Sequence, residues 1–174
     1  MPDVTAVNLA LFALRGVVGV VMLAHGINHI FGGGKIEGTG RWFESLGMRP
    51  GKLHAWFASA TEVGAGALLI MGLITPLAGA GVIGVMVVAW VTNHRTNGFF
   101  IFRPGEGYEY VMVLTFLGAI IGTLGPGHWS IDVGANLWVP SALTGLLVSV
   151  IAGVGGAAGL LVTFWRPASV DKSR

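Results

Sequence analysis

The sequence predicts an all-α, polytopic membrane bundle, and three observations indicate this fold class. Only 10% of the 174 residues are charged, and 53% are hydrophobic. A soluble domain usually carries roughly 25% charged residues. The mean hydropathy is +0.76, and the apolar residues gather into five segments. Each segment comes close to the roughly 20 residues that a helix needs to cross a bilayer. We therefore expect five transmembrane helices.

The five segments are bounded by glycine, proline or charged residues. The first contains one charge, Arg15, the second contains Glu62, and the third contains none. Residues 74–76 (Ile-Thr-Pro) leave room only for a tight turn between the second and third segments, and residues 125–127 (Gly-Pro-Gly) end the fourth. The first segment lacks the basic start of a signal peptide, so we expect a retained helix. The predicted spans are residues 7–30, 53–73, 77–93, 108–124 and 140–165.

The basic residues predict the orientation of the chain. Nine of the ten lysines and arginines lie outside the spans. All nine fall between the first and second spans, between the third and fourth, or after the fifth, and these segments share one side of the membrane if all five segments cross it. Basic loops stay cytoplasmic, which predicts an N-terminus outside and a C-terminus in the cytoplasm. A net charge of only +2 with no basic run argues against a nucleic-acid partner. The nine residues are Lys35, Arg41, Arg49, Lys52, Arg95, Arg103, Arg166, Lys172 and Arg174.

The chain contains no cysteine. This excludes a dithiol redox centre, thiolate-held iron–sulfur clusters, thiolate zinc sites and disulfides. Any redox role must therefore use a bound quinone, a metal held by other ligands, or a partner protein.

Arg15 and Glu62 are the only charged residues well inside the predicted spans. The first two helices run antiparallel, and with a rise of about 1.5 Å per residue the two side chains differ in depth by roughly 5 Å. We therefore predict that Arg15 and Glu62 form an ion pair. Two roles remain open: the pair fixes helix register, or Glu62 handles a proton or a ligand.

Four of the five histidines are expected at the cytoplasmic edge. His25 and His29 are one turn apart on the first helix, His54 opens the second, and Asn93-His94 ends the third. Three interpretations are open. The cluster lines a pocket for a quinone head group, it binds a divalent metal or b-type haem through His25 and His29, or it only provides interfacial polarity.

The fifth segment carries small residues at four-residue spacing. Such residues let membrane helices approach closely. The pattern predicts either packing inside the chain or an interface with a partner subunit or second copy through Gly145, Ser149 and Gly153. The whole series is Ser141, Gly145, Ser149, Gly153 and Ala157.

A series of short motifs occurs in order over residues 10–135. It comprises Arg15-Gly16, His25-Gly26, the stretches 62–66 (EVGAG) and 72–76 (GLITP), Asn93-His94, the stretches 97–100 (NGFF) and 107–110 (GYEY), and residues 125–132 (GPGHWSID). With this series the chain resembles the DoxX family of bacterial inner-membrane proteins, which includes the DoxD-type subunit of thiosulfate:quinone oxidoreductases. His29 departs from the family pattern, in which a lysine is common.

The resemblance implies a four-helix core over residues 1–135, with residues 136–174 adding a fifth helix and a tail. It also implies a bacterial inner-membrane location and a link to respiratory or sulfur redox chemistry, usually with partner proteins. The site residues it implies are Arg15, His25, Glu62, Asn93, His94 and Glu109.

The favoured function is a membrane subunit with a pocket for a quinone head group, to which a partner delivers electrons. Glu62 and Glu109 would accept protons, and His25 and His94, beside Asn93, would hydrogen-bond the head group. Arg15 would keep Glu62 ionised. The alternative is a non-enzymatic anchor or assembly subunit that holds a partner complex, so whether this chain is itself catalytic stays open.

Overall fold

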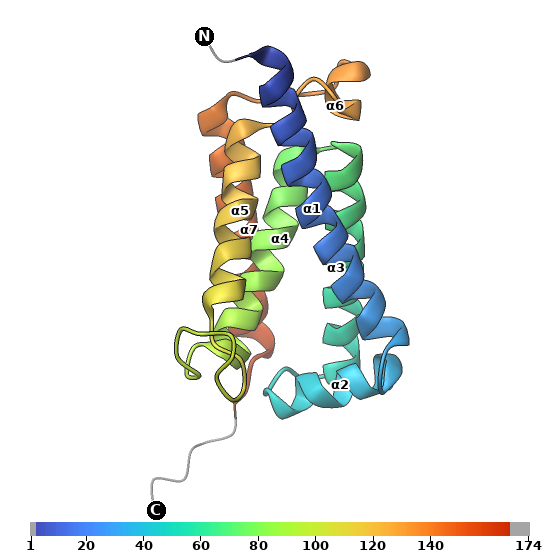
Figure 1. Ribbon diagram of the computed structural model, residues 1–174. Helices are drawn as coiled ribbons and strands as arrows, with labels where there is room; N and C mark the ends of the chain where they lie inside the picture. The colour runs from blue at the N-terminus through green and yellow to red at the C-terminus, as the bar shows by residue number, and fades with distance from the viewer. Residues whose placement is uncertain (1–2, 168–174) are drawn as a thin grey trace, which may run out of the picture.

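A computed structural model describes residues 3–167 and shows a bundle of long helices with short helices at its ends (Figure 1). The predicted all-α membrane bundle is confirmed. The elements are α1 (Val4–Phe31), α2 (Lys35–Ser45), α3 (Gly51–Met71), α4 (Thr75–Ala89), the π-helix η1 (Trp90–His94), α5 (Glu109–Leu124), α6 (Ile131–Gly134) and α7 (Ala142–Phe164).

Five long helical segments correspond to the five predicted spans. Helices α1, α3 and α7, together with α4 extended by η1, are long and apolar enough to cross a membrane. Helix α5 has 16 residues, or about 24 Å at the usual rise, which is less than the roughly 30 Å hydrocarbon core. The fourth predicted span is therefore an apolar helix of less than full crossing length.

The predicted tight turn between the second and third spans joins α3 to α4. Gly72 takes the left-handed conformation, with φ of 62°, and caps α3. Ile74 is also left-handed before α4 begins, and Pro76 occupies the first turn of that helix, where its missing N–H costs nothing.

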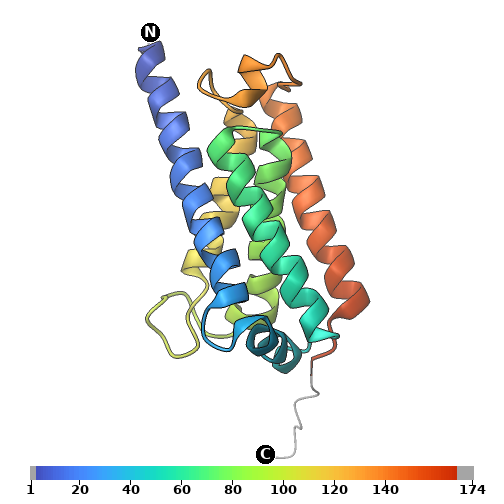
Figure 2. The same cartoon turned by 90° about the vertical axis from the view of Figure 1, so that its right-hand side faces the viewer.

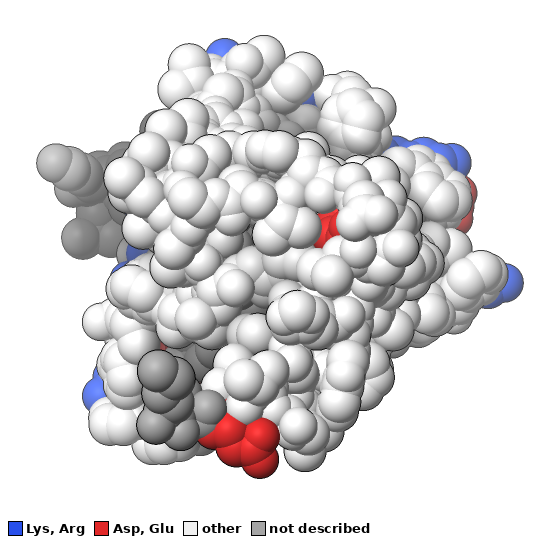
Figure 3. Space-filling model, turned by 90° about the horizontal axis from the view of Figure 1, so that it is seen from above, with Lys and Arg blue, Asp and Glu red and all other residues white. Residues whose placement is uncertain are grey.

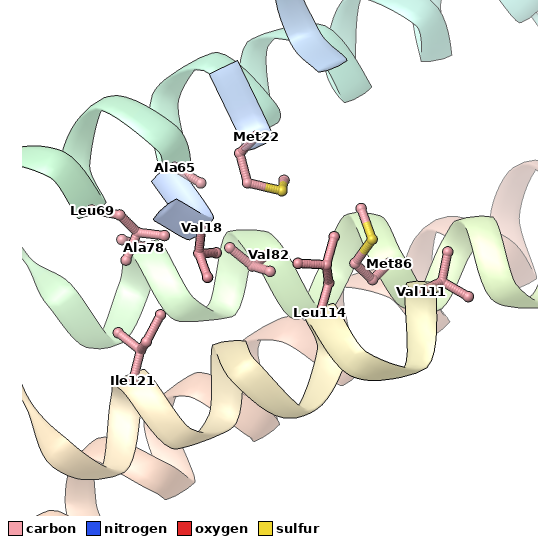
Figure 4. Close-up of a cluster of buried hydrophobic side chains, with 10 residues drawn as sticks. All are labelled: Val18, Met22, Ala65, Leu69, Ala78, Val82, Met86, Val111, Leu114 and Ile121. Atoms are coloured by element: carbon pink, nitrogen blue, oxygen red, sulfur yellow. The ribbon is translucent and has the colours of Figure 1, made fainter. Parts of the chain in front are cut away.

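The core of the bundle lies between α1, α3, α4 and α5, as Figure 4 shows. Lipid tails are as apolar as these side chains, so close packing rather than exclusion of water stabilises the contact. The buried cluster consists of Val18, Met22, Ala65, Leu69, Ala78, Val82, Met86, Val111, Leu114 and Ile121.

Glycines set the closest helix–helix contacts. At the α1–α3 crossing, a Cβ on Gly66 would lie 2.7 Å from the carbonyl oxygen of Gly19. At the α4–α5 crossing, a Cβ on Gly79 would lie 2.7 Å from the carbonyl oxygen of Gly118. These distances are too short for any side chain, so glycine determines the register of both helix pairs.

The small residues of α7 pack inside the chain. Gly145, Ser149 and Gly153 are buried, and the Ser149 hydroxyl donates to the Pro76 carbonyl of α4 at 2.8 Å. A Cβ on Gly153 would lie 2.7 Å from Cβ of Ile83. The expectation that Gly145, Ser149 and Gly153 form a partner interface is therefore wrong, because α4 and α5 of the same chain already occupy that face.

Residues 35–45, predicted only as a loop, form α2. Ile36, Gly40 and Phe43 are buried at helical spacing, and α2 lies across the end of the bundle (Figure 1). Lys52 at the start of α3 donates to the Glu37 carboxylate at 2.8 Å, and this hydrogen bond lowers the pKa of Glu37. The contact ties the exposed face of α2 to α3.

The basic residues predicted to share one side lie at one end of the bundle. This basic end comprises α2, the η1–α5 loop and the end of α7, and α1 starts at the opposite, far end (Figure 2). Seen from the far end, the surface is mostly white, with a few red acidic groups, and blue occurs only toward the outline (Figure 3). The described members are Lys35, Arg41, Arg49, Lys52, Arg95, Arg103 and Arg166, whereas Lys172 and Arg174 lie outside the described residues.

Candidate functional site

A cavity of about 640 Å³ lies in the basic half of the bundle, between α1, α2 and α3 on one side and α4, η1, α5 and α7 on the other. Small-molecule sites usually measure roughly 300–1,000 Å³. We call it the histidine cavity, because the four histidines predicted to share one end all line it. Its polar lining residues are His25, His29, His54, Thr61, Glu62, Thr92, Asn93, His94, Glu106 and Tyr110.

Glu62 of α3 faces His29 of α1 in this cavity. The carboxylate Oε2 lies 3.0 Å from His29 Nδ1, and Glu62 is only 3% exposed. At this distance the two groups are in ion-pair contact, and neither Nδ1 nor Oε2 has a hydrogen bond to any other group. Carboxylate oxygens have further lone pairs, so a ligand donor that binds beside Glu62 is favourable.

His54 is a second buried group of the cavity. It is 2% exposed, and the residues nearest its ring are aromatic. Its ring packs edge-on against Phe164 of α7, with centroids 4.9 Å apart, and also contacts Phe57. These aromatic neighbours hold the imidazole in place at the cavity wall.

His25 lies at an opening of the cavity between α1 and α5. Its Nε2 is 3.1 Å from the Tyr110 hydroxyl, within hydrogen-bonding distance, and the two rings are stacked at a tilt. Unlike His29 and Glu62, His25 is exposed. The pair can pass a proton between the opening and the cavity, because both groups can donate and accept.

The π-helix η1 brings three consecutive residues, Thr92, Asn93 and His94, to the cavity wall. Such single-turn π-helices are frequent at functional sites. His94 Nδ1 lies 2.9 Å from the Glu106 carbonyl oxygen, which can only accept, so Nδ1 carries a proton. Nε2 then accepts from the Asn93 amide at 3.3 Å. This arrangement holds the His94 ring in one tautomer.

Two predicted site residues lie elsewhere. Glu109 is half-buried at the start of α5 and is not among the lining residues. Arg15 lies near the far end, where it donates to the carbonyl oxygens of Leu69 at 2.8 Å and Trp129 at 2.6 Å.

The predicted ion pair between Arg15 and Glu62 is wrong. The Gly19–Gly66 crossing places Arg15 beside the last turn of α3, where it donates to the Leu69 carbonyl oxygen, which also accepts from the Gly72 N–H. Glu62 is seven residues earlier, about 10 Å along the helix axis, and meets His29 instead. Arg15 therefore cannot hold Glu62 ionised by direct contact.

Asp132 is a buried polar residue that the sequence pattern did not reveal. It is 1% exposed and accepts from the backbone N–H groups of Ile74 and Thr75, at 2.8 and 3.0 Å, and from the Thr75 hydroxyl at 2.9 Å. It thus caps α4 from the α5–α7 connection. Asp132 lies 57 residues after Thr75 in the chain. The sequence alone therefore does not show that the Asp132 carboxylate meets the turn at residues 72–76.

Tyr110 and Glu106 were also not predicted as site residues, although both line the cavity. Tyr110 follows Glu109 directly, and one residue along a helix turns the side chain by about 100°. The sequence therefore predicted the correct turn of α5, but Tyr110 and not Glu109 lines the cavity.

The metal interpretation of His25 and His29 has little geometric support. The two rings face different partners, Tyr110 and Glu62. Among residues 3–167, no group of three or more histidine, aspartate or glutamate side chains is arranged to hold a metal ion.

Comparison with known proteins gives a family match. The sequence model described as DoxX matches residues 10–95, about half of the chain. The matched region covers α1 from its second turn through η1, which includes Glu62 and all four histidines of the cavity. No curated protein matches the chain, and no solved structure matches it.

Proposed function

Because this chain belongs to the DoxX family, we propose that it is a membrane subunit of a redox system. In this proposal the histidine cavity receives the head group of a quinone, and a partner protein supplies the electrons. The family match covers the cavity's histidines and Glu62, and membership indicates a membrane protein, often with a redox role.

One observation carries the proposal: the cavity gathers ionisable side chains that are withdrawn from solvent. Glu62 and His54 are 3% and 2% exposed, and His29 contacts the Glu62 carboxylate at 3.0 Å. A flat head group with oxygens on opposite edges suits donors and acceptors spread over two walls of a largely apolar space. The remaining lining residues are mostly apolar, which suits an apolar ring.

The residues have distinct expected roles. The His29–Glu62 pair, whose Nδ1 and Oε2 lie 3.0 Å apart, donates a proton to a ligand oxygen that binds beside it. His25 and Tyr110, at the opening between α1 and α5, replace that proton. A bound quinone supplies the two-electron, two-proton chemistry. His94 and Asn93 form a fixed polar edge that orients the ligand.

Electrons must come from outside the chain in this proposal. The sequence has no cysteine to hold an iron–sulfur cluster and no fingerprint of a flavin- or dinucleotide-binding domain. We place the partner at the basic end, because the cavity lies in that half of the bundle.

We also propose that the chain lies in a bacterial inner membrane with the basic end in the cytoplasm. The seven described lysines and arginines at that end support this orientation through the positive-inside rule.

The proposal is tested by ligand binding to the purified protein in lipid nanodiscs. We expect ubiquinone or menaquinone analogues to raise the thermal unfolding midpoint of the wild type. Glu62→Gln should weaken binding about 10- to 100-fold, because a hydrogen bond to a charged group contributes roughly 1.5–3 kcal/mol.

The matched control is Glu109→Gln, which changes a carboxylate outside the cavity lining. We expect this variant to bind like the wild type. If neither quinone class binds the wild type at concentrations found in membranes, the proposal fails. Equal losses in both variants would contradict the role given to Glu62.

A further inference from the structure

We propose that the histidine cavity opens sideways into the lipid between α3 and α7, and that this groove holds the hydrocarbon tail of the ligand. The inference rests on the proposed function and deepens it: the ligand is an amphiphile that enters from the bilayer, not a water-soluble metabolite. We call the opening the lateral groove and define it by Phe57 and Thr61 of α3 and Ala152 and Gly156 of α7, which all line the cavity.

These four residues are both cavity-lining and exposed. A residue with both properties lies at a mouth of the cavity. Helices α3 and α7 make little contact with each other, whereas α4 packs against both. Figure 2 looks onto α3, with α7 running alongside it. The lateral groove is therefore a gap between α3 and α7, both of which pack against α4.

Small residues of α4 form the floor of the lateral groove. Gly81 and Gly84 line the cavity and are partly exposed. On the α7 wall, a Cβ placed on Gly156 would meet no atom within 4 Å, which shows free space at that point. Small side chains on two of its surfaces thus leave room in the groove for a hydrocarbon chain.

The lateral groove is closed at the basic end. His54 packs against Phe164 there, and the α2–α3 loop is bonded to the end of α7. The N–H of Arg49 donates to the Phe164 carbonyl at 3.3 Å, and that of Arg166 donates to the Gly47 carbonyl at 2.8 Å. A tail leaving the cavity on this side is therefore directed into the bilayer and not into water.

The lateral groove opens at a depth that corresponds to the hydrocarbon core of the bilayer. Phe57 and Thr61 lie six and ten residues after the start of α3 at Gly51, or about 9–15 Å from the basic end of that helix. This depth falls within the hydrocarbon core of a bilayer. The other mouth of the cavity, near His25 and Glu106, is polar and suits protons better than a tail.

The polar and apolar parts of the cavity are continuous. The buried His54 ring lies against Phe57, at the junction of the groove and the polar wall. A ligand with one oxygenated ring and one hydrocarbon tail fills both parts at once. Its head group hydrogen-bonds to the polar residues of the cavity, and its tail replaces lipid over Gly81 and Gly84.

Gly156→Phe tests the lateral groove by blocking it. Two probes are used on protein in nanodiscs: a benzoquinone with a decyl tail, and the same head group without a tail. We expect Gly156→Phe to weaken binding of the tailed probe at least tenfold, because each excluded methylene costs affinity. Binding of the tail-less probe should stay within twofold of the wild type.

The matched control is Gly155→Phe, at an exposed neighbour that does not line the cavity and also has free space around it. It should bind both probes like the wild type. On the opposite wall, Thr61→Phe should repeat the Gly156→Phe result, with Ala60→Phe as its control. The second pair keeps the test decisive if one substitution prevents folding.

A direct measurement uses a quinone whose tail ends in a photoreactive diazirine. We expect crosslinks to α3 near Phe57 and to α7 near Gly156. Crosslinks to α1 or α5 instead, or binding of the tailed probe by Gly156→Phe as tight as that of the wild type, overturn the lateral groove while leaving the quinone proposal intact. Failure of the wild type to bind either probe or to crosslink rejects both.

Discussion

At the scale of single residues, the buried polar groups at the far end and in the histidine cavity differ in their partners. Asp132 accepts three hydrogen bonds from the start of α4, and the terminal nitrogens of Arg15 donate to backbone carbonyl groups. Glu62 and His29, in the histidine cavity, contact each other, and Glu62 Oε2 and His29 Nδ1 have no hydrogen bond to the backbone. Since a structural role usually ties buried polar groups to the backbone, this pair indicates a ligand site.

Asp132 allows a test of this difference. Asp132→Ala removes three hydrogen bonds to a buried carboxylate, and we expect it to lower the free energy of unfolding by about 2–4 kcal/mol. Asp3→Ala removes a cap that accepts only from the exposed Thr5 N–H of α1 and should cost about 0.5–1 kcal/mol. Unfolding by SDS in mixed micelles measures both; equal losses would contradict the structural role of Asp132.

At the scale of elements, glycine contacts decide which side chains meet. The Gly19–Gly66 crossing sets the register of α1 against α3, and this register moves Arg15 two turns of α3 away from Glu62. Prediction of the ion pair from depth alone failed because it used estimated helix ends, and depth does not specify which face of each helix is turned inward.

The α1–α3 crossing can be tested with two glycines on one helix. Gly66→Ala places a Cβ 2.7 Å from the Gly19 carbonyl oxygen, whereas a Cβ on Gly64 meets no atom within 4 Å. We expect Gly66→Ala to lower the free energy of unfolding by about 1–3 kcal/mol through overpacking. Gly64→Ala should be neutral or stabilise by up to about 1 kcal/mol. Indistinguishable SDS unfolding curves would contradict the proposed register.

At the scale of the whole molecule, the distribution of charge makes orientation testable. The chain has no cysteine, so single-cysteine variants need no background changes. Ala135 is exposed at the far end and Thr96 at the basic end. A membrane-impermeant maleimide should label Ala135→Cys in intact cells and Thr96→Cys only after permeabilisation. The reverse pattern would overturn the proposed cytoplasmic position of the basic end.

The sequence by itself determined the membrane class, the five helical segments and the separation of basic residues to one end. These properties depend on local composition and on the alternation of segments along the chain. It also indicated that His25, His54 and His94 would lie near the same end, because helix termini alternate between the two ends of a bundle. It did not show α2, whose amphipathic pattern is only three buried residues long.

Tertiary structure alone decided which polar groups meet and which face of α7 is buried. Glu62 pairs with His29 rather than Arg15, and Gly145, Ser149 and Gly153 contact their own chain rather than a partner. The physical reason is that rotation and register of packed helices depend on close contacts between distant segments. Hydropathy places a residue at a depth in the membrane, but only those contacts determine its neighbours.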